Sequence, residues 1–541
     1  MGTTTVPRSS ATPRSAAAWF AGTRPQLNDI RVVAIVVGIG GMLVSFAGSW
    51  IPSFWGDEAA SLMSAQRSLP SLFGMLYYVD AVHGTYYLFL HGWIGLFGAS
   101  ELSVRLPSAI GIGVAAAGVV ILGNRMLSRR VGILAGIIFA LLPRVTSVGE
   151  QARSYGLGIA AAIWLTVLLV WILGREGVKR RHWLMYSLGL AGAVYLFLYL
   201  ALIAIVHAAL VLSTSGMRAM FSRWLRAVAI AVAISLPMVV WGWAQHRQIS
   251  FLARRYDIDF RRVFIEPWFA GSSELEDWTS TLWLSALCWT LVLIGGGWLL
   301  WSIRASSGRA TPGPDPSGRA GAREPAMPRA AAALLLAWLI LPAGILLLGN
   351  ELITPMYSTR YLAFCAPAVA LLIAAGICVL RGNWQQASVT VLLIALVVPG
   401  YLVQRSPFAM DGSDWREVST VIGQQARPGD AVVFGAASRP SRMPRLAMRV
   451  YPEDYRGLWD VGLVTPYYRL SQLHDRVAGL DTVGFRLADA TTVWAVAPLP
   501  AEASGVPEDV ATLQRLGFRL VRDIPFHRNG VYELTRAPAA G

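Results

Sequence analysis

Two adjacent carboxylates follow the first long apolar run of the chain, in the sequence WGDEA at residues 55–59. Trp50 and Trp55 flank the turn, and tryptophan favours the interface between membrane and water. A carboxylate at that depth, Asp57 or Glu58, can act as a general base on an incoming hydroxyl group. The alternative is an ordinary acidic pair at the start of a helix near Ala59, where negative charge favours the helix dipole.

Four later motifs place further polar groups beside apolar runs. They are Asp80-Ala81-Val82-His83, the ELSVRLPS stretch that contains Arg105, the EQARSYGL stretch that contains Arg153 and Tyr155, and Thr359-Arg360-Tyr361. Arginine binds phosphate esters through charge-assisted, often bidentate hydrogen bonds. Each arginine taken singly fits equally well an interfacial side chain that snorkels to water. As a set on one predicted face, the three arginines favour a phosphate site.

The composition indicates that a lipid bilayer positions these motifs. Of the 541 residues, 55% are hydrophobic and 14% are charged, and the mean hydropathy is +0.51. A soluble protein carries about 25% charged residues. The net charge of +15 comes almost entirely from arginine, and with the abundant alanine and glycine this indicates a G+C-rich genome. Because the arginines fall in short clusters between apolar runs, they predict cytoplasmic loops, and a nucleic-acid partner is set aside.

Ten apolar runs reach or approach the length of a membrane-spanning helix, about 17 to 20 residues. They are Val32–Ile51, Leu106–Gly123, Val131–Val148, Tyr155–Leu173, Trp183–Ser213, Ala227–Gln245, Thr279–Ile303, Ala330–Gly349, Tyr361–Leu380 and Ala387–Val403. The fifth run is long enough for two short helices with a turn near Tyr199, so about eleven spans are expected. The shorter run Thr85–Gly98 predicts a juxtamembrane or partly inserted helix.

The domain organisation follows from these runs and from the arginine clusters. We expect a disordered cytoplasmic tail at residues 1–28, a transmembrane catalytic domain at 29–405 and an extracytoplasmic α/β domain at 406–541. Within the membrane domain, residues 52–105 form the first exterior loop and 304–329 a flexible cytoplasmic linker. A second exterior loop, between His246 and Trp278, mixes arginines with acidic residues, which favours a structured lid that covers a site and not a signal for membrane orientation. Strand-length runs at 431–435, 491–499 and 530–536 alternate with helical segments at 415–425 and 509–516.

Two other patterns are assigned no chemistry. The three cysteines, Cys288, Cys365 and Cys378, show neither metal-ligand spacing nor an even count. Residues 38–41 read GIGG but lie inside an apolar run, so they indicate helix packing and not a nucleotide-binding loop.

From Trp50 to Pro367, the order of these motifs resembles that of the GT-C glycosyltransferases of the protein-O-mannosyltransferase and aminoarabinose-transferase type (glycosyltransferase family 39), and the expected source is bacterial, of actinobacterial type. The resemblance implies transfer of a sugar from a polyprenyl-phosphate donor to an extracytoplasmic glycan, lipid or protein acceptor. It makes Asp57 the catalytic base with Glu58 beside it. It also makes Arg105, Arg153, Arg360 and Tyr361 candidates for the donor phosphate, and Asp80, His83 and Tyr155 candidates for substrate binding. The family's HPP segment is altered here, because Gly84 and Thr85 follow His83.

The favoured sugar is mannose, a common polyprenyl-linked donor in related families, with arabinose and aminoarabinose left open. No metal ligand and no cofactor is assigned, although a divalent cation is possible; membrane lipids are expected around the spans. The alternative function is a transporter or flippase of lipid-linked saccharides, which would use the same arginines without a base. A non-catalytic glycan sensor is disfavoured, because its membrane part would not need charged helix mouths.

Overall fold

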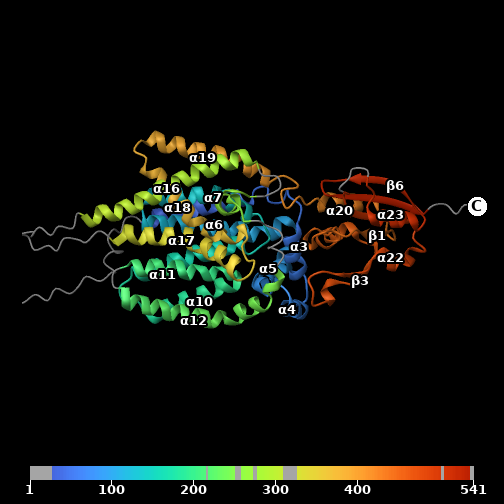
Figure 1. Cartoon of the computed structure of the whole chain (residues 1–541), viewed down its shortest axis with the longest axis horizontal. Helices are drawn as coiled ribbons and strands as arrows, with labels where there is room; N and C mark the ends of the chain where they lie inside the picture. The colour runs from blue at the N-terminus through green and yellow to red at the C-terminus, as the bar shows by residue number, and fades with distance from the viewer. Residues whose placement is uncertain are drawn as a thin grey trace, which may run out of the picture.

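The computed structural model describes residues 27–214, 217–249, 258–271, 277–308, 326–500 and 505–536. It has two parts, long helices at the left of Figure 1 and a sheet domain at the right. Short helices, among them α3, α4 and α5, lie between the two parts. Most of the tail predicted at 1–28, much of the linker at 304–329 and parts of the loop between His246 and Trp278 lie outside the described residues.

The helical part contains the following elements in chain order: α2 (Leu27–Phe46), α3 (Gly56–Ala65), α4 (Leu69–Tyr78), η1 (Ala81–His83), α5 (Gly84–Phe97), α6 (Glu101–Met126), α7 (Arg129–Leu141), α8 (Pro143–Gly149), α9 (Tyr155–Leu173), α10 (Arg180–Leu196), η2 (Leu198–Leu202), α11 (Ile203–Ser213), α12 (Met217–Ala244), η3 (His246–Ile249), α14 (Phe260–Phe264), α15 (Glu266–Phe269), α16 (Trp278–Gly308), α17 (Ala326–Leu352), η4 (Thr359–Cys365), α18 (Ala366–Val379) and α19 (Asn383–Gln404). The helix expected at Thr85–Gly98 is α5, which is 14 residues long.

Within the described residues, eight helices are long and apolar enough to cross a membrane, and the bent pair α7 and α8 makes a ninth. The chain is therefore a multi-pass membrane protein. The predicted total of eleven also counted both halves of the run Trp183–Ser213. That run does break near Tyr199, but its two halves, α10 and α11, have only 17 and 11 residues. The two short helices that the sequence predicted in this run account for the difference between the nine candidate spans and the eleven expected.

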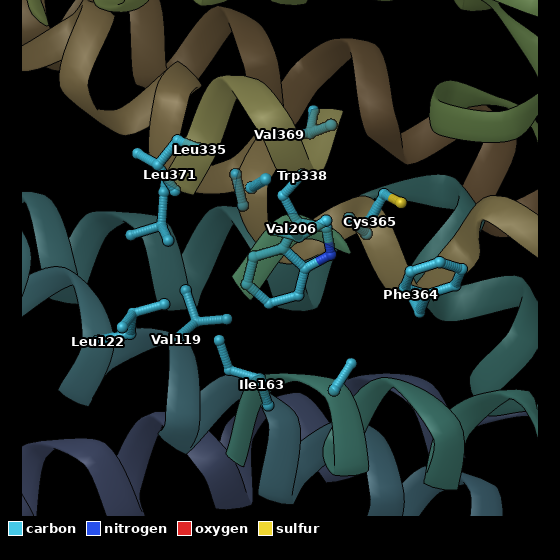
Figure 2. Close-up of a cluster of buried hydrophobic side chains, with 14 of the residues drawn as sticks. Val119, Leu122, Ile163, Val206, Leu335, Trp338, Phe364, Cys365, Val369 and Leu371 are labelled. Carbon is cyan, nitrogen blue, oxygen red and sulfur yellow. The ribbon is translucent and has the colours of Figure 1, made fainter. Parts of the chain in front are cut away.

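Burial separates the central helices from those that face lipid. In the most apolar stretch of α6, 72% is buried inside the protein, whereas in that of α19 only 17% is buried. A helix that is apolar on all sides must be surrounded by lipid or by other helices, and α6 is surrounded by other helices. Figure 2 shows side chains of α6, α9, α11, α17 and α18 meeting around Trp338, whose side chain is fully buried.

Close packing and one bend shape this bundle. A Cβ atom on Gly113 of α6 would lie 2.6 Å from the carbonyl oxygen of Gly38 in α2, so the GIGG segment packs helices together, as predicted. Helices α7 and α8 meet at an angle of 61° where Pro143 interrupts the hydrogen-bond pattern. The bend turns α8 and its Arg144 away from the axis of α7.

The sheet domain comprises α20 (Trp415–Gln425), β1 (Ala431–Phe434), η5 (Pro440–Arg442), α21 (Leu446–Val450), η6 (Pro452–Tyr455), β2 (Trp459–Asp460), β3 (Leu463–Thr465), η7 (Tyr467–Arg469), β4 (Arg476–Val477), α22 (Leu480–Val483), η8 (Gly484–Leu487), β5 (Thr492–Pro498), α23 (Glu508–Arg515), β6 (Phe518–Pro525) and β7 (Asn529–Arg536). The main sheet has the order β2-β1-β5-β7-β6, and β3 pairs with β4. Strands β2, β1 and β5 are parallel, while β7 is antiparallel to both β5 and β6. The predicted α/β character is confirmed.

Candidate functional site

The predicted acidic pair lies in the first turn of α3. The backbone of Trp55 is extended, and α3 begins at the next residue. Acidic side chains favour this position because the helix N-terminus carries partial positive charge. The two carboxylates nevertheless have different surroundings, since neighbouring residues of a helix point about 100° apart.

Glu58 faces inward and forms a fully buried ion pair with Arg105 of α6. The guanidinium donates to both carboxylate oxygens, at 2.8 and 2.6 Å. Its remaining N–H groups donate to the carbonyl oxygens of Ser49, Pro52 and Ser53. Arginine has five N–H donors, so Arg105 is saturated by protein acceptors. In this geometry Arg105 offers nothing to a phosphate, and Glu58 supports the turn instead of facing a substrate.

Asp57 faces outward and pairs with Arg360 of η4, with 2.5 Å between Oδ2 and NH1. The carboxylate keeps 26% of its side-chain surface exposed. Arg360 also lies over the ring of Trp55, 5.0 Å from its centroid. Burial raises the pKa of Asp57, but the charges of Arg360 and Arg153 outweigh it and hold the pKa below its usual value. Asp57 is therefore ionised, and part of its carboxylate is accessible at the protein surface.

Arg153 closes the inner side of this group. It donates to the carbonyl oxygen of Asp57 at 3.2 Å and to Ser61 Oγ at 3.3 Å, and its NH2 lies 3.3 Å from His83 Nε2. Since arginine cannot accept a hydrogen bond, His83 Nε2 is the acceptor and the ring is neutral. Burial and the neighbouring Arg153 lower the pKa of His83 to about 4, which agrees with a neutral ring.

The other predicted residues surround the same group. Asp80, which precedes η1 in a left-handed conformation, accepts a hydrogen bond from the Tyr87 hydroxyl at 3.0 Å. Tyr361 stacks on Tyr199 with 4.7 Å between ring centroids. Tyr155 packs edge-on against Phe197. The structure thus brings the predicted acidic, arginine and aromatic residues to one end of the bundle, although Arg105 and Glu58 are inside its wall.

A cavity of about 630 Å³ lies beside the Asp57–Arg360 pair, and Trp55 and Arg360 form part of its wall. Its charged lining residues are Arg144, Arg262, Arg360, Glu150, Glu266, Glu351 and Asp411. Burial raises the pKa of Glu150 to about 7, against the opposing charge of Arg405, which lies 3.4 Å away. A space of this size with both arginines and carboxylates suits a polyhydroxylated, anionic ligand.

Two arginines of the cavity were not among the predicted site residues. Arg144 lies within the apolar run Val131–Val148, and a charge inside such a run is itself a signal of function. Arg262 belongs to the loop that was predicted to be a lid, and the described part of that loop, including α14 and α15, forms one wall of the cavity. Arg144 also donates to the carbonyl oxygen of Glu266, which fastens this wall to α8.

Within the ranges that the structure describes, no three His, Cys, Asp or Glu side chains gather as metal ligands. The divalent cation that the sequence left open therefore has no ligand set among those residues.

Comparison with known proteins gives one family match. The model of the family described as dolichyl-phosphate-mannose-protein mannosyltransferase matches residues 85–243. A search of curated proteins finds no match.

The fold is similar to solved structures at low sequence identity. The crystal structure of ArnT from Cupriavidus metallidurans bound to undecaprenyl phosphate is 13% identical, with a TM-score of 0.54, over 92% of this chain and 97% of that one. Its apo state gives 12% identity and a TM-score of 0.52 over the same shares. The apo oligosaccharyltransferase of Archaeoglobus fulgidus gives 11% and 0.49, over 88% of this chain and 70% of that one.

Proposed function

We propose that this chain is a GT-C glycosyltransferase that transfers a sugar from a polyprenyl-phosphate donor to an acceptor outside the cytoplasm, and the family match over residues 85–243 and the similarity of fold support this. The observation that carries the proposal is the ionised Asp57, paired with Arg360 at the wall of a cavity that also holds Arg144 and Arg262. ArnT, which shares the fold, has been solved bound to undecaprenyl phosphate, which supports a lipid-phosphate donor. The family description supports mannose as the favoured sugar, with arabinose and aminoarabinose as alternatives.

Asp57 is the proposed general base. As the acceptor hydroxyl attacks the anomeric carbon, its proton passes to the carboxylate and the bond from that carbon to the donor phosphate breaks. Arg360 and Arg153 keep Asp57 charged before the reaction. A carboxylate that is already ionised accepts the proton without any preceding deprotonation step.

The cavity arginines are the proposed phosphate site. Negative charge develops on the phosphate as the glycosidic bond breaks, and fixed guanidinium groups stabilise it without reorganisation. Arg360 was predicted for this role from the sequence, and Arg144 and Arg262 join it because they line the same cavity. Arg105 is left out because its N–H groups are all bonded within the protein.

The remaining predicted residues have supporting roles in the proposal. Arg153 and the neutral His83 hold the inner side of the Asp57 turn, and Asp80 and Tyr155 complete its surroundings. Tyr361 forms an aromatic wall next to Arg360. The carboxylates of the cavity, such as Glu266 and Asp411, are placed to accept hydrogen bonds from sugar hydroxyl groups.

The decisive experiment compares Asp57→Asn with Asp481→Asn, a control at an exposed position of α22. Purified protein is offered a panel of radiolabelled polyprenyl-phosphate sugars with a cell-envelope extract, and product formation and donor binding are both measured. We expect Asp57→Asn to lower the transfer rate about a hundred- to ten-thousand-fold, with donor binding retained, and Asp481→Asn to behave as the unchanged protein. A transporter or flippase of lipid-linked saccharides would tolerate Asp57→Asn, and that result would overturn the proposal.

A further inference from the structure

The turn that carries Asp57 into α3 is held from outside by the sheet domain. The Tyr451 hydroxyl accepts a hydrogen bond from the backbone N–H of Phe54 at 3.0 Å, and Ser413 Oγ donates to the Phe54 carbonyl at 2.6 Å. Both polar backbone groups of Phe54 are thus bonded to side chains 397 and 359 positions later in the chain. Phe54 is three residues before the proposed base.

Arg416 of α20 holds the preceding residues in the same way. Its guanidinium donates to the carbonyl oxygens of Ile51 at 2.6 Å and Trp50 at 2.9 Å. It also pairs with Glu101 of α6 at 2.6 Å, and the Tyr451 hydroxyl donates to the same carboxylate oxygen, again at 2.6 Å. Carbonyl groups outside regular structure need such donors. On the opposite side of the turn, Arg105 supplies donors to residues 49, 52 and 53.

The first residue of α3 also rests directly on the sheet domain. A Cβ atom on Gly56 would lie 2.2 Å from the carbonyl oxygen of Ser441 in η5. Strand β1 leads into η5, so the carboxyl end of this parallel strand faces the turn that bears Asp57. Contacts of this kind leave the Asp57 backbone little room to move.

From these contacts we infer that the sheet domain is part of the catalytic apparatus, with Tyr451 and Arg416 as positioning residues for Asp57. The inference rests on the proposed function, in which Asp57 is the base. A base must be held within about 0.5 Å of its productive position. Asp57 lies in the first turn of α3, directly after residues 53–55, which have no regular structure. The contacts that fix the outer side of this segment include those of Tyr451, Ser413, Ser441 and Arg416.

The kinetic test uses Tyr451→Phe, which keeps the ring against Phe54 and removes only the hydroxyl group. Tyr455→Phe is the matched control, because that buried hydroxyl accepts a hydrogen bond from Ser419 within the sheet domain. We expect Tyr451→Phe to lower kcat about 10- to 100-fold, the scale for misplacement of a catalytic group by about 1 Å. KM for the donor should stay within about twofold, because the cavity arginines are untouched. Arg416→Lys should retain more activity than Arg416→Met, because it keeps the positive charge.

A second measurement does not depend on activity. Hydrogen exchange of the backbone amides at residues 53–58 should be faster in Tyr451→Phe than in the unchanged protein, and unaltered in Tyr455→Phe. If wild-type protein transfers no sugar but the exchange result holds, the proposed function fails. The contacts of the sheet domain with residues 50–56 are then a structural feature without a catalytic role. If both variants lose kcat equally, or if exchange at 53–58 does not change, the positioning inference is overturned.

Discussion

Asp57 and Glu58 show how two neighbouring carboxylates acquire different properties from their surroundings. Asp57 is partly exposed and paired with a partly exposed arginine, whereas Glu58 and Arg105 are both fully buried. A buried pair adds little net stability when complete, but removing one charge leaves the other without compensation. Asp57 is therefore accessible, as the proposed base must be, while Glu58 is needed to neutralise the buried Arg105.

This difference predicts the effect of Glu58→Gln. The substitution leaves the buried Arg105 without its counter-charge and should lower the free energy of unfolding by about 3 to 5 kcal/mol. Thermal unfolding of detergent-purified protein measures the loss. The matched control is Glu453→Gln, which breaks an ion pair with Arg456 whose side chains are 74% and 78% exposed. If both variants unfold at the same temperature as the wild type, the Glu58–Arg105 pair does not have the role we assign to it.

Short elements at the end of the bundle that meets the sheet domain position several of the charged groups of the candidate site. The bend at Pro143 brings Arg144 to the cavity, η4 brings Arg360 to Asp57, and η1 brings His83 to Arg153. Two glutamines hold the chain around η1. Gln245, which follows α12, accepts a hydrogen bond at Oε1 from the N–H of Ala81 at 2.9 Å. Gln248 of η3 donates from Nε2 to the carbonyl oxygen of Tyr78 at 2.7 Å. Irregular backbone is tolerated here because other side chains bond its polar groups.

The contact between α3 and η5 predicts that Gly56→Ala is harmful. The added methyl group would meet the Ser441 backbone, which cannot move aside like a flexible side chain. We expect lower transfer activity and a lower unfolding temperature. Gly74→Ala in α4 is the control, because nothing lies within 4 Å of its Cβ position, and alanine there should stabilise the helix by up to about 1 kcal/mol. Equal behaviour of the two variants would contradict the close contact.

The whole molecule places the site at one end of the membrane bundle and the arginine clusters at the other. Helix α6 starts at Glu101, which bonds to Arg416 of the sheet domain, and ends 25 residues later beside Arg125 and Arg129. A helix of this length spans about 39 Å, enough to cross the bilayer. The positive-inside bias predicts that these arginines are cytoplasmic, and this prediction would place the sheet domain and the cavity on the opposite side of the membrane.

Cysteine labelling tests this orientation. Single cysteines are introduced by Arg129→Cys and Ser438→Cys, both at exposed positions, after the three native cysteines are replaced by alanine. In intact cells, a membrane-impermeant maleimide should label the Ser438→Cys protein and should label the Arg129→Cys protein only after the cells are opened. The reverse pattern would place the site in the cytoplasm and rule out an extracytoplasmic acceptor.

The sequence by itself determined the features that depend on neighbouring residues. The apolar runs gave the membrane helices, because the length of an apolar segment is a local property. The regular elements at 415–425, 431–435 and 491–499 were predictable from their periodicity, and α20, β1 and β5 occupy those segments. Strand β6 was missed because it lies at the edge of the sheet, with most of its residues at least partly exposed, and shows no clean alternation. The motif order likewise indicated Asp57 and Arg360.

Only the tertiary structure decided which charged groups face a ligand. Arg105 and Arg360 look alike in the sequence, but Arg105 meets acceptors 47 to 56 positions earlier and is saturated, whereas Arg360 lines the cavity. In the sequence Arg144 is part of an apolar run, whereas in the structure the bend at Pro143 places it in the wall of the cavity. The contacts of Tyr451 with Phe54 join the segment before α3 to the sheet domain, 397 positions later in the chain. Hydrogen bonds between residues so far apart depend on how the helices and the sheet domain pack, and no local pattern records that packing.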